Sequence, residues 1–206
     1  MKTSDFIGIA LSVLLLILMM GGDPPPPISS QYSNSTNINV STEYPQKRID
    51  IRPIFNDVNT YFSNHIKGFY SPNIKVFSNA INSSCGLVYE VAVYCPADST
   101  VYIKSSIAED LNNLGFPNNE SSIGYVISHE VGHHVQYLLK AKVTENGADC
   151  LSGGWVKYTS LANINSVTIA ANSAGGDNPS VYGHGSGSTR INQVMRGYNG
   201  KFSICF

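Results

Sequence analysis

One segment of this 206-residue chain constrains the fold more than any other, because it predicts a helix that carries a cluster of ionisable side chains. Apolar side chains recur there at helical spacing, at Val126, Ile127, Val131, Val135, Leu138 and Leu139. We expect Ser121 or Ser122 to cap the N-terminus of this helix. His129 and His133 lie four residues apart, so the spacing places their imidazoles on one face.

The two histidines and the glutamate between them form a His-Glu-x-x-His pattern. Two imidazoles on one helix face can bind a single zinc ion. Glu130 is placed to take a proton from zinc-bound water and to pass it later to a leaving amine. On a semi-buried helix, bare imidazoles and a carboxylate are costly without a partner, which a metal ion supplies. The pattern predicts a zinc centre with Glu130 as general base.

A third ligand is expected from the start of the next predicted helix. Glu145 can bind the zinc ion while Asp149, one turn later, accepts the second ring N–H of a ligand histidine. If the first helix continued to Lys140, however, Asp149 would lie opposite His133 and would itself be the ligand. Glu145 is the ligand if the first helix ends near Tyr137. The spacing leaves both alternatives open.

Several further motifs lie on either side of this helix. They are Cys85-Gly86, Tyr94-Cys95-Pro96-Ala97-Asp98, Glu145-x-x-Ala148-Asp149-Cys150, Gly153-x-Trp155, His184-Gly185-Ser186 through Arg190, and Cys205-Phe206. Together with the segment 129–136, they resemble the bacterial family of neutral zinc metallopeptidases over residues 52–206. The resemblance implies a gluzincin-like site on a zincin-like fold, with peptide or protein substrates.

The same resemblance implies a role for each site residue. His129, His133 and Glu145 would bind Zn²⁺, and Glu130 would be the base. His184 would hydrogen-bond the oxyanion of the tetrahedral intermediate, whereas without the resemblance it is equally a surface loop histidine.

Two features depart from the family pattern. The segment between His133 and Glu145 is shorter than usual, and Asn146-Gly147 replaces bulkier residues. Glycine within a helix is unfavourable by about 1 kcal/mol relative to alanine. The alternative is therefore a catalytically weakened or inactive envelope or surface module, which keeps zinc only for stability. A structural zinc site does not need Glu130, so this residue favours catalysis.

The N-terminal segment predicts export. Residues 6–20 are apolar but fewer than the ~20 that span a bilayer comfortably, so residues 1–22 are either a signal peptide or a membrane anchor. A proline-rich and Ser/Asn-rich linker follows at 23–43, and the folded domain is expected at 44–206. We expect a membrane-anchored or secreted protein. Charged residues make up 13% of the chain, which argues against a nucleic-acid partner.

Four cysteines, an even number in an exported chain, predict disulfides. Four cysteines allow three pairings. We favour Cys85 with Cys95, which would close a short loop, and Cys150 with Cys205, which would tie the second half to the C-terminal segment.

The expected fold is α+β, with a small sheet over the His129 helix and further helices. Helices are predicted at 53–69, 105–114, 145–171 and 188–196, and strands at 74–77, 87–94 and 100–104.

Overall fold

The computed structural model describes residues 49–175 and 185–206, all within the compact unit Pro45–Phe206. The predicted leader at 1–22, the linker at 23–43 and His184 lie outside the described residues and stay predictions. Within the two described ranges, no helix is long and apolar enough to cross a membrane.

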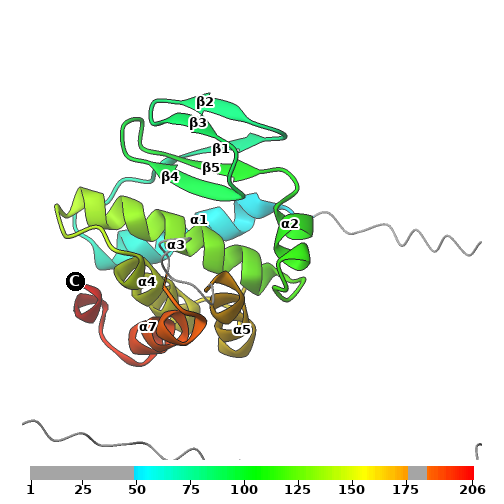
Figure 1. Cartoon of the computed structure of the whole chain (residues 1–206). Helices are drawn as coiled ribbons and strands as arrows, with labels where there is room; N and C mark the ends of the chain where they lie inside the picture. The colour runs from blue at the N-terminus through cyan, green and yellow to red at the C-terminus, as the bar shows by residue number, and fades with distance from the viewer. Residues whose placement is uncertain (1–48, 176–184) are drawn as a thin grey trace, which may run out of the picture. The chain divides into compact units, whose positions relative to one another are not determined.

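Along the described residues one helix is followed by five short strands and then by a run of helices, which confirms a mixed α+β architecture. The order is α1 (Ile51–His65), β1 (Asn73–Phe77), β2 (Ile81–Ser83), β3 (Gly86–Val88), β4 (Ala92–Cys95), β5 (Thr100–Lys104), α2 (Ile107–Asn113), α3 (Glu120–Leu138), α4 (Glu145–Tyr158), α5 (Ile164–Ala174), α7 (Gly187–Asn199) and the 3₁₀ helix η1 (Phe202–Cys205). Figure 1 shows the strands on one side of α3, with α4, α5 and α7 on the other.

The main sheet has three strands in the order β1-β5-β4. β1 pairs with β5 in parallel and β4 pairs with β5 antiparallel, which leaves β4 at the edge above α3 (Figure 1). Tyr94 turns its side chain towards α3, whereas its neighbours Val93 and Cys95 pack with the β2–β3 hairpin. Successive side chains of a strand point to opposite faces of the sheet, and here both faces of β4 are covered.

The prediction of a single strand at 87–94 is wrong. The segment breaks at 89–91, and its first half pairs with β2 in a separate antiparallel hairpin. Tyr89 and Glu90 are exposed at the break, and the Tyr89 N–H donates to the Glu90 carboxylate instead of to a neighbouring strand. The short strand β2 has no counterpart in the sequence-based prediction.

The capping residue of α3 is Asn119, so the prediction of Ser121 or Ser122 is wrong. The Asn119 side-chain oxygen accepts the Ser122 N–H, and Ser122 donates its hydroxyl to the Pro117 carbonyl. An Asn at this position is as good a cap as Ser. The two serines are buried inside the first turn.

The predicted helix over 145–171 is also wrong, because two helices occupy this segment. Thr159 ends α4 in an extended conformation, and its hydroxyl accepts the Leu161 N–H. Asn163 then caps α5 by accepting the Ser166 N–H. Polar side chains that bond the local backbone compete with a continuous helix, which explains a break that contains neither Gly nor Pro.

The helix α4 is held against α7 and η1 by close backbone contact and by a disulfide. A Cβ atom at Gly153 would overlap the Val194 carbonyl, and one at Gly197 would overlap the Cys150 carbonyl. Both expected disulfides are present, Cys85–Cys95 beside the hairpin and Cys150–Cys205 between α4 and η1. The face of α4 that carries Glu145 and Asp149 is thereby fixed relative to α7.

Candidate metal centre

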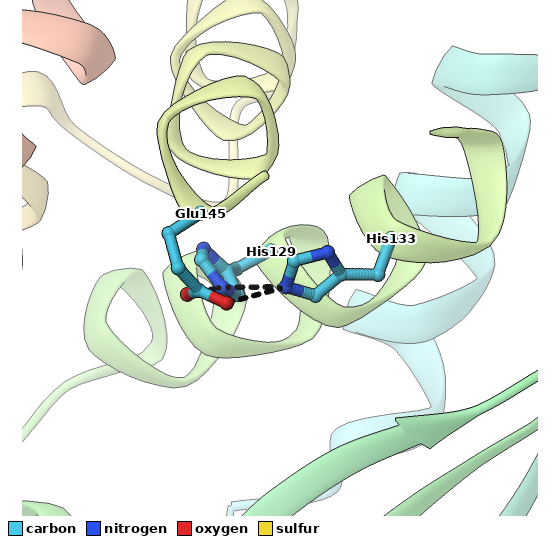
Figure 2. Close-up of side chains that lie close together, drawn as sticks. All are labelled: His129, His133 and Glu145. Atoms are coloured by element: carbon cyan, nitrogen blue, oxygen red, sulfur yellow. Dashed lines mark hydrogen bonds and ion pairs between the residues drawn. The ribbon is translucent and has the colours of Figure 1, made fainter. Parts of the chain in front are cut away.

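Three side chains from two helices converge at the centre of the unit. The Nε2 atoms of His129 and His133, both on α3, lie 3.2 Å apart. The Glu145 carboxylate from α4 lies 3.0 Å from His129 Nε2 and 3.3 Å from His133 Nε2. Figure 2 shows the carboxylate and both rings pointing towards one another.

These separations fit a metal ion. Donor atoms arranged tetrahedrally at zinc–nitrogen and zinc–oxygen distances lie about 3.3 Å from one another. One donor atom from each residue lies within 4.8 Å of the other two. Two imidazoles and a carboxylate are also ligands that zinc commonly takes. The three residues therefore match zinc in both chemistry and spacing.

The turn between α3 and α4 decides which acidic residue faces the histidines. α3 ends at Leu138, and Lys140 adopts a left-handed conformation with φ 52°. The Gln136 side chain then holds the turn, because it donates to the Thr144 carbonyl and accepts the Thr144 N–H. The helix ends within one residue of Tyr137, and Glu145 is the acid beside both Nε2 atoms.

Gln136 also explains one departure from the family pattern. A Cβ atom at Gly147 would overlap the Gln136 side-chain nitrogen, so a larger residue at this position would displace Gln136. Gln136 in turn accepts the His133 Nδ1–H at 3.1 Å, which fixes the ring with Nε2 towards the cluster. Gly147 therefore makes room for the residue that orients a candidate ligand, and it need not indicate a degenerate site.

Asp149 lies behind His129, on the side away from Glu145. Its Oδ1 atom accepts the His129 Nδ1–H at 2.8 Å and the Tyr125 hydroxyl at 2.7 Å. Arg190 from α7 donates to both carboxylate oxygens, at 2.9 and 2.8 Å. Asp149 is fully buried, so this pairing replaces the water that its charge has lost. Such a bond fixes the histidine tautomer, so that Nε2 is the ring nitrogen left to bind a metal ion.

The pKa values follow from this geometry. Burial acts to lower the pKa of His129, but the Asp149 charge and the hydrogen bonds with Asp149 and Glu145 outweigh it and raise that pKa to about 9. Burial acts in the opposite sense on Asp149, and His129 and Arg190 hold its pKa below the usual range. Without metal, both ring nitrogens of His129 are therefore protonated at neutral pH, and their N–H groups donate to Asp149 and to Glu145.

Metal binding should consequently release a proton. Because zinc needs the unprotonated Nε2 atom, protons compete for it below the His129 pKa of about 9. We expect the apparent association constant for zinc to rise about tenfold per pH unit towards that pKa and to level off above it. Chelator competition at several pH values measures this slope. An association constant that does not change over the same range would contradict the prediction.

Glu130 lies half-buried on α3 beside the cluster, with its carboxylate towards the sheet edge. Its Oε2 atom accepts the backbone N–H of Tyr94 in β4 at 2.7 Å. Glu130 and His129 both line two separate pockets, and His133 and Glu145 also line the second of these. The Glu130 carboxylate is thus fixed by β4 at a point that borders both pockets.

The neighbouring His134 ties the same strand to α3. Its Nε2–H donates to the Tyr70 carbonyl at 2.8 Å, so its Nδ1 atom accepts the Tyr94 hydroxyl at 3.0 Å. Burial lowers the pKa of His134, which favours this neutral form. Tyr94 therefore contacts α3 twice, through its backbone at Glu130 and through its side chain at His134.

Removing the Tyr94 hydroxyl should destabilise this contact. Tyr94→Phe leaves the buried Nδ1 atom of His134 without its donor, and we expect a loss of about 1–3 kcal/mol in the free energy of unfolding. Urea denaturation measures this loss as a lower midpoint, provided that the m-value is unchanged. Tyr89→Phe is the control, because Tyr89 is 63% exposed and should change little. Equal midpoints for the two variants would refute the expected role.

Several of these residues had no role in the sequence-based prediction. Tyr125 lies four residues before His129, and Gln136 lies three after His133, so helical spacing could have placed them on the ligand face. Tyr94 and Arg190 come from elements far away in the sequence, and their only signal was their place in the motifs that resemble the family.

Comparison with known proteins places the chain in a family. The family model described as "Putative neutral zinc metallopeptidase" matches residues 4–150, which include the His129 helix, Glu145 and Asp149. The chain belongs to this family. No solved structure matches it significantly.

Two curated relatives are uncharacterized proteins. The chain is 28% identical over 171 residues to YpfJ of Escherichia coli K12, which covers 65% of this chain and 60% of YpfJ. It is 28% identical over 195 residues to Rv2575 of Mycobacterium tuberculosis H37Rv, which covers 73% of this chain and 67% of Rv2575. The chain thus spans less than two thirds of the length of YpfJ.

Proposed function

We propose that the chain is a zinc-dependent metallopeptidase of zincin-like fold, which hydrolyses peptide bonds in peptide or protein substrates. Family membership supports a zinc peptidase. The observation that carries the proposal is the position of Glu130, held by the Tyr94 N–H beside His129 and facing both pockets.

His129, His133 and Glu145 would hold the zinc ion. When bound there, zinc would polarise the scissile carbonyl and lower the pKa of a water molecule. Asp149 and Gln136 hold the two imidazoles so that their Nε2 atoms face one another and Glu145. The chain's own residues thus orient the ligands before any metal arrives.

Glu130 is the proposed general base. It would take a proton from the attacking water and return it to the leaving amine. The Tyr94 N–H fixes Oε2, so the carboxylate is oriented by the strand before substrate binds. His184, outside the described ranges, stays a proposed donor to the oxyanion.

The free edge of β4 is the proposed binding site for an extended substrate. The Val91 carbonyl accepts the Lys104 N–H and so faces β5. Because backbone groups alternate along a strand, those of Ala92 face outwards to the open edge. A substrate strand pairing there would pass directly over Glu130.

A catalytically inactive zinc module is the weaker alternative. A structural zinc site is closed by a fourth protein ligand. Among the described residues, the cluster here brings together three candidate ligands, and all three line the same pocket. The role of Gly147 beside Gln136 removes one reason to expect a degenerate site.

Export is also proposed. The apolar residues 6–20 would direct the chain into or across a membrane, either as an anchor or as a cleaved signal. The two disulfides support an oxidising compartment, since such bonds are rare in the cytosol.

The test uses the full chain in detergent, stripped of metal and then loaded with zinc. We expect one zinc per chain, cleavage of casein, loss of cleavage with a chelator and recovery when zinc is added back. A chain that binds one zinc and cleaves neither casein nor a peptide library would refute the proposal.

A further inference from the structure

The turn between α3 and α4 exposes apolar and basic side chains together. Tyr137, Leu139 and Val143 are 52%, 43% and 56% exposed. Lys140 and Lys142 are exposed in the same short segment. Apolar residues that lie singly on a surface are normal, whereas a group of them marks an interaction site. We call these five residues the exposed turn, which Figure 1 shows at the end of α3, at the left of the view.

Tyr70 adds a second aromatic ring beside the exposed turn. Its ring lies 5.1 Å from the ring of His134, which precedes Tyr137 by three residues on α3. Residues three apart on a helix are neighbours on its surface, so the two tyrosines border the same region. Tyr70 is 51% exposed. The exposed apolar surface therefore extends beyond the turn itself.

The two lysines of the turn have no carboxylate partner in the part of the chain that the structure describes. Lys140 also adopts the left-handed conformation that ends α3, with φ 52°. Its N–H donates to the Tyr137 carbonyl, and the Ala141 N–H donates to the Gln136 carbonyl. Glycine is the usual residue at this position of such a helix end, because a Cβ atom is unfavourable there. The sequence thus keeps an unpaired positive charge where glycine would fit the backbone better.

This combination of side chains fits a lipid surface better than a protein partner. Lysine is depleted in protein–protein interfaces. At a membrane, tyrosine rings lie at the level of the headgroups, and lysine side chains extend to the polar surface. Residues 137–144 contain no acidic residue, so the turn complements anionic lipids. Glu90 and Glu145 line a pocket together with Tyr137 and Val143, and Glu145 is directed to the two histidines of the cluster.

The N-terminal segment gives a reason for a second membrane contact. Residues 6–20, proposed as an anchor or a signal, are fewer than the ~20 that span a bilayer comfortably. Stable attachment to a membrane commonly needs two signals. As an anchor, this segment would tether the folded unit through residues 21–48. A tethered site is present at a high effective concentration, so even a weak surface contact is populated.

We propose that the exposed turn and Tyr70 dock on an anionic lipid surface. The apolar side chains would lie among the headgroups, and the lysines would contact lipid phosphates. Tyr137 and Val143 also line the pocket that contains His133 and Glu145, so docking brings this pocket next to the bilayer. The inference uses the proposed membrane location and does not depend on peptidase activity.

The test uses the full chain, reconstituted into vesicles through its N-terminal segment. Leu139→Trp places a fluorescent reporter in the turn, since Trp155 is the only other tryptophan and is fully buried. Vesicles of brominated phosphatidylcholine are compared with vesicles that also contain phosphatidylglycerol. We expect stronger quenching with phosphatidylglycerol, and loss of this difference in 1 M salt, where the Debye length is about 3 Å. Ile169→Trp, at an exposed site on α5, is the control reporter and should show no such difference.

Removing either lysine should weaken docking without unfolding the chain. Lys140→Gly suits the left-handed position, so this variant should be at least as stable as the wild type. In the Leu139→Trp background, Lys140→Gly and Lys142→Gln should each lower the ratio of docked to free chain about fivefold. Lys157→Gln removes an exposed lysine on α4 and is the matched control, which should leave the ratio unchanged.

The proposal fails if quenching is equal in the two kinds of vesicle or unchanged in both lysine variants. Quenching in neither kind of vesicle would point to a protein partner and would also overturn it. So would quenching of the Ile169→Trp reporter that matches that of Leu139→Trp, because another face would then lie on the membrane. A chain that docks but cleaves no peptide keeps this inference while the peptidase proposal fails. A chain that cleaves peptides but shows no preference for phosphatidylglycerol gives the opposite outcome.

Discussion

Glu130→Gln should reduce the turnover of peptide substrates by about 10²–10⁴-fold and leave the zinc content unchanged. Glutamine cannot accept the proton that the attacking water must lose. Its amide oxygen can still accept the Tyr94 N–H, so the contact between α3 and β4 is kept. The change touches none of the proposed metal ligands. Steady-state kinetics and metal analysis of the same sample measure the two quantities.

Glu120→Gln is a matched control for this experiment. Glu120 is an exposed carboxylate on the same helix, in its first turn, so the variant removes an equal charge without reaching the centre. We expect wild-type kinetics from it. If Glu130→Gln retained turnover within a few-fold of the wild type, Glu130 would not be the base, and another group would have to carry the proton.

Asp149→Asn should be the most destabilising single substitution at the candidate centre. It removes the charge that faces Arg190 and His129 in a fully buried position. Breaking a buried ion pair from one side costs about 3–5 kcal/mol, because the partner charge stays buried without compensation. The bond that orients His129 also weakens, so zinc affinity should fall about 10–100-fold. Chemical denaturation of the metal-free chain and zinc competition measure these effects separately.

Two further variants isolate the cause. Glu109→Gln removes an exposed carboxylate on α2 and should change the free energy of unfolding by less than about 0.5 kcal/mol. Arg190→Met in the Asp149→Asn background removes the uncompensated charge, and we expect part of the stability to return. A double variant as unstable as the sum of the two single variants would show that the pair is not coupled.

The sequence predicts the residues of the centre better than its surroundings. Helical spacing places His129 and His133 on one face, and the turn after α3 has the length that brings Glu145 to them. The contacts that support these residues join parts of the chain that are far apart in the sequence. Tyr94 reaches Glu130 and His134 across 36 and 40 residues, and Arg190 reaches Asp149 across 41. No local pattern encodes such pairs.

The helices and strands show the same difference between features with a local sequence signal and features without one. Both disulfides and the positions of β1, β5 and α2 agree closely with the prediction, since each has a strong local signal. The breaks between β3 and β4 and between α4 and α5 are absent from the prediction. Both depend on side chains that bond the backbone in place of regular structure, at Glu90 and at Thr159 and Asn163.

The bond between Glu130 and Tyr94 has a consequence for self-association. An open sheet edge is a template on which another copy of a chain can add a strand and begin to aggregate. At β4 the outward N–H of Tyr94 is already occupied by the Glu130 carboxylate. A foreign strand would therefore find one backbone donor fewer on this edge, which weakens edge-to-edge assembly. The proposed catalytic base would thus also protect the sheet edge that substrate must reach.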